Sequence, residues 1–519
     1  MTSSDVLVIG GGHNGLVCAA VLARSGRRVV LVEAEAELGG AARTHEFHPG
    51  FRASLAHLLN RLHPEVIGAL DLERHGLRLA DGGAAPTMIL SGGPPLVLKG
   101  AYGETLAGEI ARDETAAWAR VRSQLIRYAG VLKPMLTRAP PSLAGMSWGE
   151  KLSLGNVALS LRRLGKDDMR DFLRVLLMNV ADFADDELSD ERLKVLLAFD
   201  ATLGMHLGPR SPTSLLGLLY RLSGEVAGKA GGQAFVIGGM GAVAEAMRVA
   251  ATAAGVDFRT GASVARIRVE KGHAIGVVLT SGEEIAAQTI VSAINPATTL
   301  LDLVGSRAID TGIVRKAKNI RMKGNAAKLH LALDGVPAFA GVGNDALRGR
   351  LVIARSVNHV EEAFNPAKYG EFSTDPVMEI TLPSLTDPSL APASGAVLSA
   401  IVQYAPYALK EGWQEGKPKF LAAIMAALER HAPGIGRLVR HAELLTPLDI
   451  EQRYRMPGGH WHHGELQADQ MLMSRPFFGS EDYTTPIDGL WLAGSGSHPG
   501  GGVSGVPGLN AARKIVGGR

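Results

Sequence analysis

The chain has 519 residues, of which 46% are hydrophobic and 64 are glycine, a composition typical of α/β enzymes rather than of disordered or fibrous chains. This length is enough for two or three domains, because single cores rarely grow beyond ~250–300 residues. The 54 basic residues nearly balance the 51 acidic ones, which argues against a nucleic-acid partner.

The first predicted elements form a strand–helix–strand unit. Residues 5–10 are a continuous apolar run of the kind that is buried on both faces of a parallel sheet. Residues 15–25 are helical, and residues 28–33 form a second apolar strand that ends on an acid. This order predicts one βαβ unit at the start of the chain.

A glycine fingerprint lies at the turn of this unit. Gly10 permits the tight turn, Gly12 lets the backbone approach a pyrophosphate, and Gly15 lets the helix pack closely on the strand. The helix N-terminus favours phosphate groups, and Glu33 can accept hydrogen bonds from ribose hydroxyls. The motif predicts a bound dinucleotide.

A second glycine pair follows the acid, in the stretch Gly39-Gly40-Ala-Ala-Arg43. Two glycines allow close approach of the backbone to a cofactor. Arg43 is either a partner of the pyrophosphate or a surface arginine.

The chain then becomes irregular, with a helix predicted over residues 54–70 and mostly helical sequence from 104 to 222. One apolar stripe at helical spacing comprises Met169, Phe172, Leu173, Leu176 and Leu177. Basic residues precede it, so it is either a membrane-surface element that takes up a lipophilic substrate or the core of a cap domain.

Residues 237–247 form a glycine turn that opens a helix, which we expect to pack on the nucleotide domain. A first set of strands is predicted at 263–269, 274–280 and 289–294. A second set is predicted at 327–333, 376–382 and 396–402, followed by a helix at 417–431. The second set indicates an α+β substrate domain.

The C-terminus carries a second glycine-rich strand–loop–helix. Residues 490–495 are a strand that ends at Gly494 and Ser495, and the loop through Gly502 and Val503 opens the last helix. The N-terminus of that helix would favour the negative charge that develops on a reduced flavin. Two such halves predict FAD rather than NAD, and with one dinucleotide module we expect no stable NAD site.

Cys18 is the only cysteine, so the chain has neither an intramolecular disulfide nor a CxxC redox pair. No signal peptide and no run of ~20 apolar residues is present. We expect a cytoplasmic protein, with peripheral membrane contact left open, and the sequence does not specify its oligomeric state.

These motifs resemble the phytoene desaturase-like FAD oxidoreductases, and within them the pyridine nucleotide-disulfide oxidoreductase domain-containing protein 2 group. The resemblance rests on Gly10-Gly-Gly-His13-Asn14-Gly, Leu38-Gly-Gly-Ala-Ala and Gly494-Ser-Gly-Ser-His498-Pro-Gly-Gly-Gly. It also includes Gly464-Glu465-Leu and Arg475-Pro476. Despite the name of the group, the single cysteine excludes a disulfide-reductase mechanism.

The resemblance implies a glutathione-reductase-type, Rossmann-like FAD domain assembled from discontinuous segments, with an α+β substrate domain and a helical cap. The expected FAD domain comprises residues 1–80, 225–300 and 450–519, and the expected substrate and cap domain comprises 81–224 and 301–449. The expected FAD-binding residues are Gly10, Gly12, His13, Asn14, Gly15, Glu33, Ala34, Gly40, Ala41, Arg43, Val264, Gly494, Ser495, Gly502 and Val503.

Histidines are the candidate catalytic groups. His460 and His462 belong to the run Gly459-His-Trp-His-His463-Gly-Glu465, and on an extended segment their side chains would converge. The run could in principle bind a metal, but histidines that face flavin or substrate, or structural histidines, are the favoured interpretations, and we expect no metal. His498 and His57 could also line the flavin pocket.

The leading hypothesis is an FAD-dependent dehydrogenase or desaturase that transfers a hydride from an apolar or lipophilic small molecule to flavin. The alternatives are a flavin amine oxidase and a non-enzymatic prenyl- or lipid-binding protein of the Rab GDP-dissociation-inhibitor type. The sequence specifies neither the base nor the electron acceptor.

Overall fold

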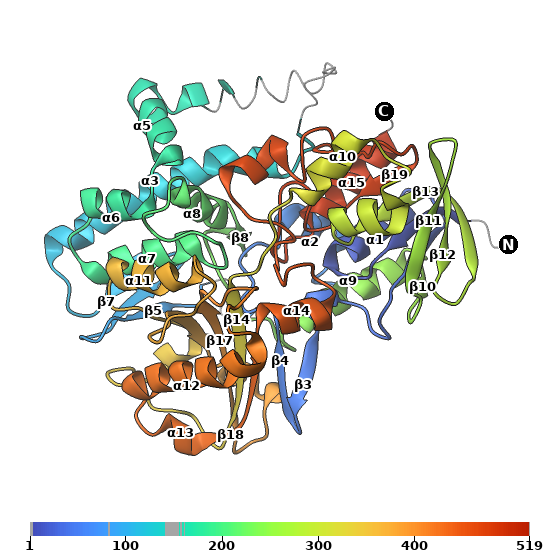
Figure 1. Cartoon of the computed structure of the whole chain (residues 1–519). Helices are drawn as coiled ribbons and strands as arrows, with labels where there is room; N and C mark the ends of the chain where they lie inside the picture. The colour runs from blue at the N-terminus through green and yellow to red at the C-terminus, as the bar shows by residue number, and fades with distance from the viewer. Residues whose placement is uncertain are drawn as a thin grey trace.

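Two large β-sheets organise the chain in the computed structural model, which describes residues 4–80, 82, 84–140, 155, 158, 159 and 161–517 (Figure 1). Among these residues, no helix is both long and apolar enough to cross a membrane. The α/β class and the Rossmann-like sheet expected from the sequence are both confirmed.

The first sheet has seven strands in the order β10-β2-β1-β13-β12-β11, with β19 paired to β13. The strand β1 lies between β2 and β13 and runs parallel to both, so the predicted βαβ unit is formed by β1, α1 and β2. The bounds are β1 (Ser4–Ile9), α1 (His13–Arg24), β2 (Val29–Val32), β10 (Asp257–Arg259), β11 (Val264–Glu270), β12 (His273–Leu279), β13 (Glu284–Ser292) and β19 (Leu490–Leu492).

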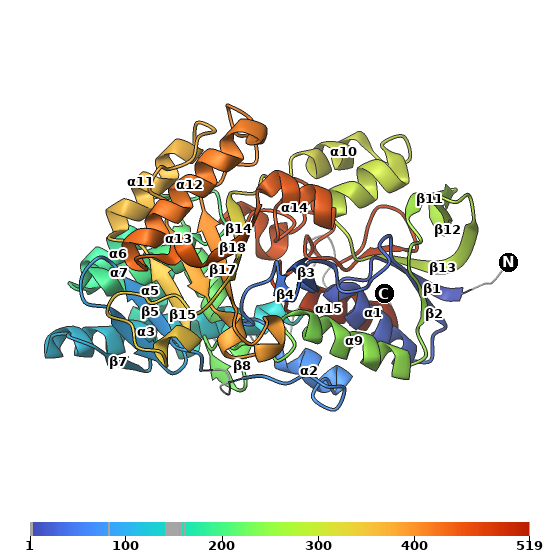
Figure 2. The same cartoon turned by 90° about the horizontal axis from the view of Figure 1, so that it is seen from below.

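Three helices cover one face of the parallel strands of this sheet, and its antiparallel strands β11 and β12 fold back over the other face (Figure 1, Figure 2). The helices are α1, α9 (Gly241–Ala253) and α15 (Val506–Gly517). The two ends of the chain meet here, because α15 packs directly on α1. A Cβ on Gly508 would lie 2.1 Å from the backbone oxygen of Asn14, so only glycine permits this approach.

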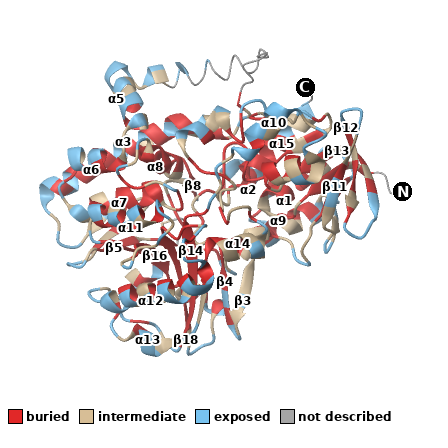
Figure 3. Cartoon of the chain, in the orientation of Figure 1, coloured by how far each residue is buried: buried red, intermediate tan, exposed pale blue. Residues whose placement is uncertain are grey.

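The second sheet has eight strands in the order β18-β14-β17-β16-β15-β5-β6-β7. Its central strands are buried (Figure 3). The bounds are β5 (Thr87–Leu90), β6 (Leu96–Lys99), β7 (Thr105–Ala107), β14 (Ala326–Leu333), β15 (Arg350–Ile353), β16 (Met378–Thr381), β17 (Ala396–Gln403) and β18 (Val439–Leu445).

Helices cover both faces of the second sheet (Figure 1). One face packs on α12 (Trp413–His431), and the other packs on a helical layer. That layer consists of α3 (Arg112–Leu136), α5 (Lys166–Leu177), α6 (Val180–Glu187), α7 (Glu191–Thr202), α8 (Ser214–Leu222) and α11 (Val357–Ala367).

Shorter elements complete the fold. They are the hairpin of β3 (Thr44–His48) and β4 (Phe51–Ser54), the strands β8 (Glu225–Val226) and β9 (Lys229–Ala230), and the helices α2 (Pro64–Leu70), α10 (Thr311–Lys318), α13 (Ile435–Leu438) and α14 (Pro447–Tyr454). The helix predicted over residues 54–70 is wrong in its first half, because it begins only at Pro64. Proline is well suited to the first turn of a helix, where its missing N–H has no partner.

The apolar stripe of α5 is only partly buried. Phe172 and Leu176 pack in the helical layer, whereas Leu173 and Leu177 are 52% and 71% exposed. The stripe therefore contributes to the core on one side only. The division of the chain into the predicted FAD and substrate domains stays a prediction.

We expect Gly508→Ala to lower the free energy of unfolding by roughly 1–3 kcal/mol, because the added methyl group forces α15 away from α1. Gly130→Ala is the matched control, since a Cβ on this glycine of α3 meets no atom within 4 Å, and it should be neutral or stabilising. Chemical denaturation followed by circular dichroism measures both. Equal stability of the two variants would contradict the close packing of the chain ends.

Candidate functional site

A cavity of about 510 Å³ is lined by residues of both large sheets. One end is formed by the glycine loops that follow β1, β2 and β19, and the other by the helical layer and the eight-stranded sheet. The predicted residues on its wall are Gly10, Gly12, His13, Asn14, Glu33, Ala34, Gly40, Ala41, Arg43, Val264, Ser495, Gly502, Val503, His57 and His462.

The fingerprint loop places a helix N-terminus at this wall. Gly10 has a φ of +99°, which L-residues with a side chain rarely adopt. Gly12 caps α1 with a φ of −71°, and a Cβ there would meet no atom within 4 Å. Gly15 does not line the cavity. It serves packing instead, because a Cβ on Gly15 would lie 2.0 Å from the backbone oxygen of Gly10.

Two buried polar atoms beside this loop have no hydrogen-bond partner among the described residues. They are Nε2 of His13 and Oδ1 of Asn14. Buried polar groups normally find a partner. Burial also lowers the pKa of His13 to about 4, so its ring is neutral at pH 7 and presents one donor and one acceptor.

The acid at the end of β2 is held by the backbone. Glu33 accepts a hydrogen bond from the N–H of Gly11 at 2.6 Å and one from the N–H of Glu35 at 2.9 Å. The loop with Gly40 lies alongside, since the N–H of Gly39 donates to the oxygen of Gly11 at 2.8 Å. The side chain of Arg43 is 22% exposed, and its Nη1 lies 3.7 Å from Oε2 of Glu37.

The C-terminal loop is bonded directly to the fingerprint. Nδ2 of Asn14 donates to Oγ of Ser495 at 3.0 Å, across 481 positions of sequence. Gly502 and Val503 line the cavity next to it. Gly494 does not line the cavity. It allows two backbone segments to approach closely, because a Cβ on Gly494 would lie 2.4 Å from the backbone oxygen of Ile294.

A buried arginine fixes the histidine-rich turn against this loop. The guanidinium of Arg475 donates to three backbone carbonyl oxygens: those of Glu465 at 3.1 Å, Ser495 at 2.9 Å and His462. Burial lowers the pKa of Arg475 to about 10, so the group stays charged at pH 7. It therefore joins two segments that both line the cavity.

The candidate histidines separate into two groups. Residues 460–463 form a turn in which the N–H of His463 donates to the oxygen of His460 at 2.8 Å, so the expected extended conformation is wrong. The rings of His460 and His462 still converge, with centroids 5.8 Å apart. His462 and His463 line the cavity, whereas His460 faces Glu465 at 3.4 Å.

His498 is not among the residues that line the cavity. Its Nδ1 lies 3.3 Å from the oxygen of Leu472, and its Nε2 lies 2.8 Å from the oxygen of Met135 at the end of α3. Both ring nitrogens are therefore occupied by backbone carbonyls.

The far wall of the cavity contains a buried charge network, of which only His57 was expected from the sequence. Nζ of Lys328 lies 2.6 Å from Nδ1 of His57, and Nε2 of His57 lies 3.9 Å from Oε1 of Glu379. Arg350 pairs with Glu379 at 2.5 Å and also pairs with Asp200. Lys328 was detectable, because it is a lysine inside the run 326–333, in which every other residue except His330 is apolar.

Each carboxylate on this far wall is matched by a guanidinium. Asp200 faces Arg221 at 3.3 Å in addition to Arg350. Buried charges are stable only when paired in this way. The far wall therefore leaves neither carboxylate unpaired.

Burial sets the protonation of the basic groups behind this wall. Desolvation lowers the pKa of Lys328 to about 7. It also lowers the pKa of His57 well below its ordinary value, with further lowering by the charges of Lys328 and Arg350. At neutral pH the imidazole of His57 is therefore neutral, and Lys328 is near half protonation.

The remaining surface of the far end is mostly apolar. Side chains from the helical layer, from β17 and from the turn after α14 meet there: Leu203, Met205, Ile401, Trp461 and Leu466. Such a lining with a few fixed polar groups is typical of small-molecule sites.

Comparisons with known proteins agree with this architecture. Residues 15–516 match the family of flavin-containing amine oxidoreductases. The chain is 34% identical to pyridine nucleotide-disulfide oxidoreductase domain-containing protein 2 of Rattus norvegicus, over 98% of this chain and 93% of that protein. It is 31% identical to a neurosporene-forming phytoene desaturase of Cereibacter sphaeroides, over 62% of this chain and 60% of that protein.

A solved structure of putrescine oxidase with putrescine bound shares the fold, with a TM-score of 0.62 and 14% identity over 99% of this chain and 98% of that one. The resemblance to phytoene desaturase-like oxidoreductases is confirmed, and the non-enzymatic alternative is set aside. The chain belongs to the family of flavin-containing amine oxidoreductases and is an FAD-dependent oxidoreductase.

Proposed function

We propose that this oxidoreductase is a dehydrogenase or desaturase that removes a hydride from an apolar small molecule. The observation that carries the proposal is the continuity of one cavity from the glycine loops to the largely apolar far end. We also propose that the enzyme lies in the cytoplasm. Peripheral contact with a membrane is part of the same proposal, and the exposed side chains of Leu173 and Leu177 on α5 support it.

The glycine-loop end of the cavity fits FAD. Gly12 leaves open space where a Cβ would stand, and the N-terminus of α1 supplies free N–H groups for a pyrophosphate. Polar atoms of His13 and Asn14 without partners supply further contacts. We assign Glu33, Ala34 and Val264 to the adenosine side, Gly10, Gly12, Gly40, Ala41 and Arg43 to the phosphates, and Ser495, Gly502 and Val503 to the ring side.

FAD, when bound, supplies an acceptor for a hydride. If the substrate is a saturated C–C unit, a proton must also leave the neighbouring carbon. His57 lines the cavity, and its Nε2 is buried without a hydrogen-bond partner among the described residues. We assign Nε2 of His57 as the acceptor of this proton, with the proton on Nδ1 passing to the neutral amine of Lys328 at 2.6 Å.

The pairing of charges on the far wall favours an uncharged substrate over an amine. A protonated amine would need an unpaired carboxylate, and both Asp200 and Glu379 are matched by arginine. Amine oxidation remains the second candidate, because the aromatic residues Tyr220 and Trp461 both line the cavity. The face of Tyr220 is, however, covered by the guanidinium of Arg61, which lies 3.5 Å from the ring centroid.

A substrate panel distinguishes the two candidates. The FAD-loaded enzyme is mixed anaerobically with apolar alkenes, alcohols and amines, and loss of the oxidised flavin absorbance is followed. We expect reduction by an apolar hydrocarbon or alcohol. Reduction by amines alone would refute the dehydrogenase proposal and establish the second candidate.

We expect Gly12→Ala to weaken FAD binding by about tenfold or more, roughly 1.4 kcal/mol, because the methyl group occupies the space of the pyrophosphate. The fold should be retained, since the methyl group meets no protein atom within 4 Å and φ is ordinary. Gly68→Ala on the exposed surface of α2 is the control. Titration of the apoprotein with FAD measures the Kd, and unchanged binding in Gly12→Ala would oppose the phosphate assignment.

The proposed proton transfer predicts a pH dependence. Because the neutral amine of Lys328 is the required form and its pKa is about 7, the rate of flavin reduction should rise with pH through that value. Lys328→Met should slow reduction about 10²–10⁴-fold and remove this step from the pH profile. Stopped-flow measurements with the best panel substrate test both, and an unchanged pH profile in the variant would exclude Lys328 from the relay.

A further inference from the structure

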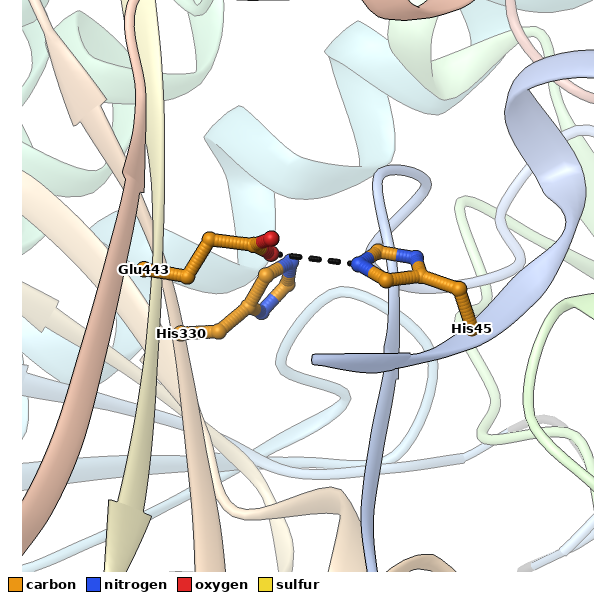
Figure 4. A group of neighbouring side chains, drawn as sticks. All are labelled: His45, His330 and Glu443. Atoms are coloured by element: carbon orange, nitrogen blue, oxygen red, sulfur yellow. Dashed lines mark hydrogen bonds and ion pairs between the residues drawn. The ribbon is translucent and has the colours of Figure 1, made fainter. Parts of the chain in front are cut away.

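Three side chains of types that can ligate metals meet outside the cavity, between the hairpin of β3 and β4 and the edge of the eight-stranded sheet (Figure 4). They are His45 on β3, His330 on β14 and Glu443 on the edge strand β18. One ligand atom of each lies within 4.8 Å of the other two. Nε2 of His45 is 3.1 Å from Oε2 of Glu443.

His330 presents a buried nitrogen to this cluster. Its side chain is fully buried, and Nε2 has no hydrogen-bond partner among the described residues. The other ring nitrogen, Nδ1, lies 3.2 Å from Oγ of Ser399. With the ring proton on Nδ1, this hydrogen bond leaves a lone pair on Nε2, which is how proteins commonly orient a histidine ligand.

The carboxylate of Glu443 is held so that one oxygen remains for the cluster. Nη1 of Arg453 donates to Oε1 at 2.6 Å, while Oε2 faces His45. The side chains of His45 and Glu443 are 18% and 19% exposed, so the cluster is open to solvent on one side. An ion can therefore enter without unfolding of the sheet.

We propose that His45, His330 and Glu443 bind one divalent transition-metal ion of the zinc class. Two imidazoles and one carboxylate suit such an ion, whereas Mg²⁺ and Ca²⁺ prefer oxygen ligands. Ligand atoms around a tetrahedral zinc ion lie roughly 3.4 Å apart, so small side-chain rotations close the observed spacing. Water completes the coordination on the exposed side.

The ion would tie the hairpin to the wall of the reaction cavity. The strand β3 directly follows the Gly39-Gly40 loop, and His330 is two positions from Lys328 on the same face of β14. Metal occupancy would therefore restrain the segment that joins the FAD loops to the substrate wall. The sequence gives no indication of this site, because His45 and Glu443 are 398 positions apart.

The test uses the full-length, FAD-loaded enzyme after removal of metals with a chelator. Isothermal titration calorimetry with Zn²⁺ should show one site per chain, and the same titration with Mg²⁺ should show none. Hydrogen exchange of residues 44–54 should slow when Zn²⁺ is added. Absence of a stoichiometric Zn²⁺ site in the stripped enzyme would overturn the proposal.

Variants locate the site. His45→Gln and Glu443→Gln change partly exposed ligands and should each weaken Zn²⁺ binding at least tenfold, and Ser399→Ala should weaken it about 10–100-fold through the orientation of His330. His441→Gln is the matched control. This exposed histidine lies on β18, as Glu443 does, but its ring stacks on that of His48, with centroids 5.0 Å apart, and it is not part of the cluster. Circular dichroism confirms that each variant is folded.

If His45→Gln and Glu443→Gln bind Zn²⁺ like the wild type, or if His441→Gln alone abolishes binding, the assigned ligands are wrong.

Discussion

The contact between the two ends of the chain is the constraint on which the cavity depends. Helix α15 can lie against α1 only because Gly508 has no side chain, and this approach brings Ser495 within 3.0 Å of Nδ2 of Asn14. That bond is buried, so the loss of either partner would leave a polar group without compensation. The same contact places the loop of Gly502 and Val503 beside the fingerprint, and both line the cavity.

The glycine-loop end could be predicted because its signals are local. The apolar runs of β1 and β2 and the spacing of Gly10, Gly12 and Gly15 all lie within one βαβ unit of about 30 residues. The packing role of Gly15 followed from the same motif, but that of Gly494 did not: both glycines serve close approach of backbones rather than the cavity surface.

The far end could not be predicted in the same way, because its residues come together only in the folded sheet. His57, Lys328 and Glu379 come from a loop and two different strands of the eight-stranded sheet. His57 was a candidate for the pocket from the sequence, and Lys328 carried a signal of its own, since a charged residue in a buried strand requires a partner. The turn at 460–463 differs from the expected extended segment for a related reason: Arg475 and backbone hydrogen bonds, rather than local propensity, decide its conformation.

The origin of the cavity wall in both ends of the chain has a consequence for biosynthesis. A growing chain emerges with its N-terminal end first, and domains fold as their segments become complete. Here α1 can pack on α9 once residues 241–253 have been made, but it lacks its partner α15 until residues 506–517 have followed. The part of the apolar surface of α1 that α15 covers is thus exposed until the end of translation, so the nascent enzyme carries an aggregation-prone surface over that period, and capture of its cofactor is one of the last events of its maturation.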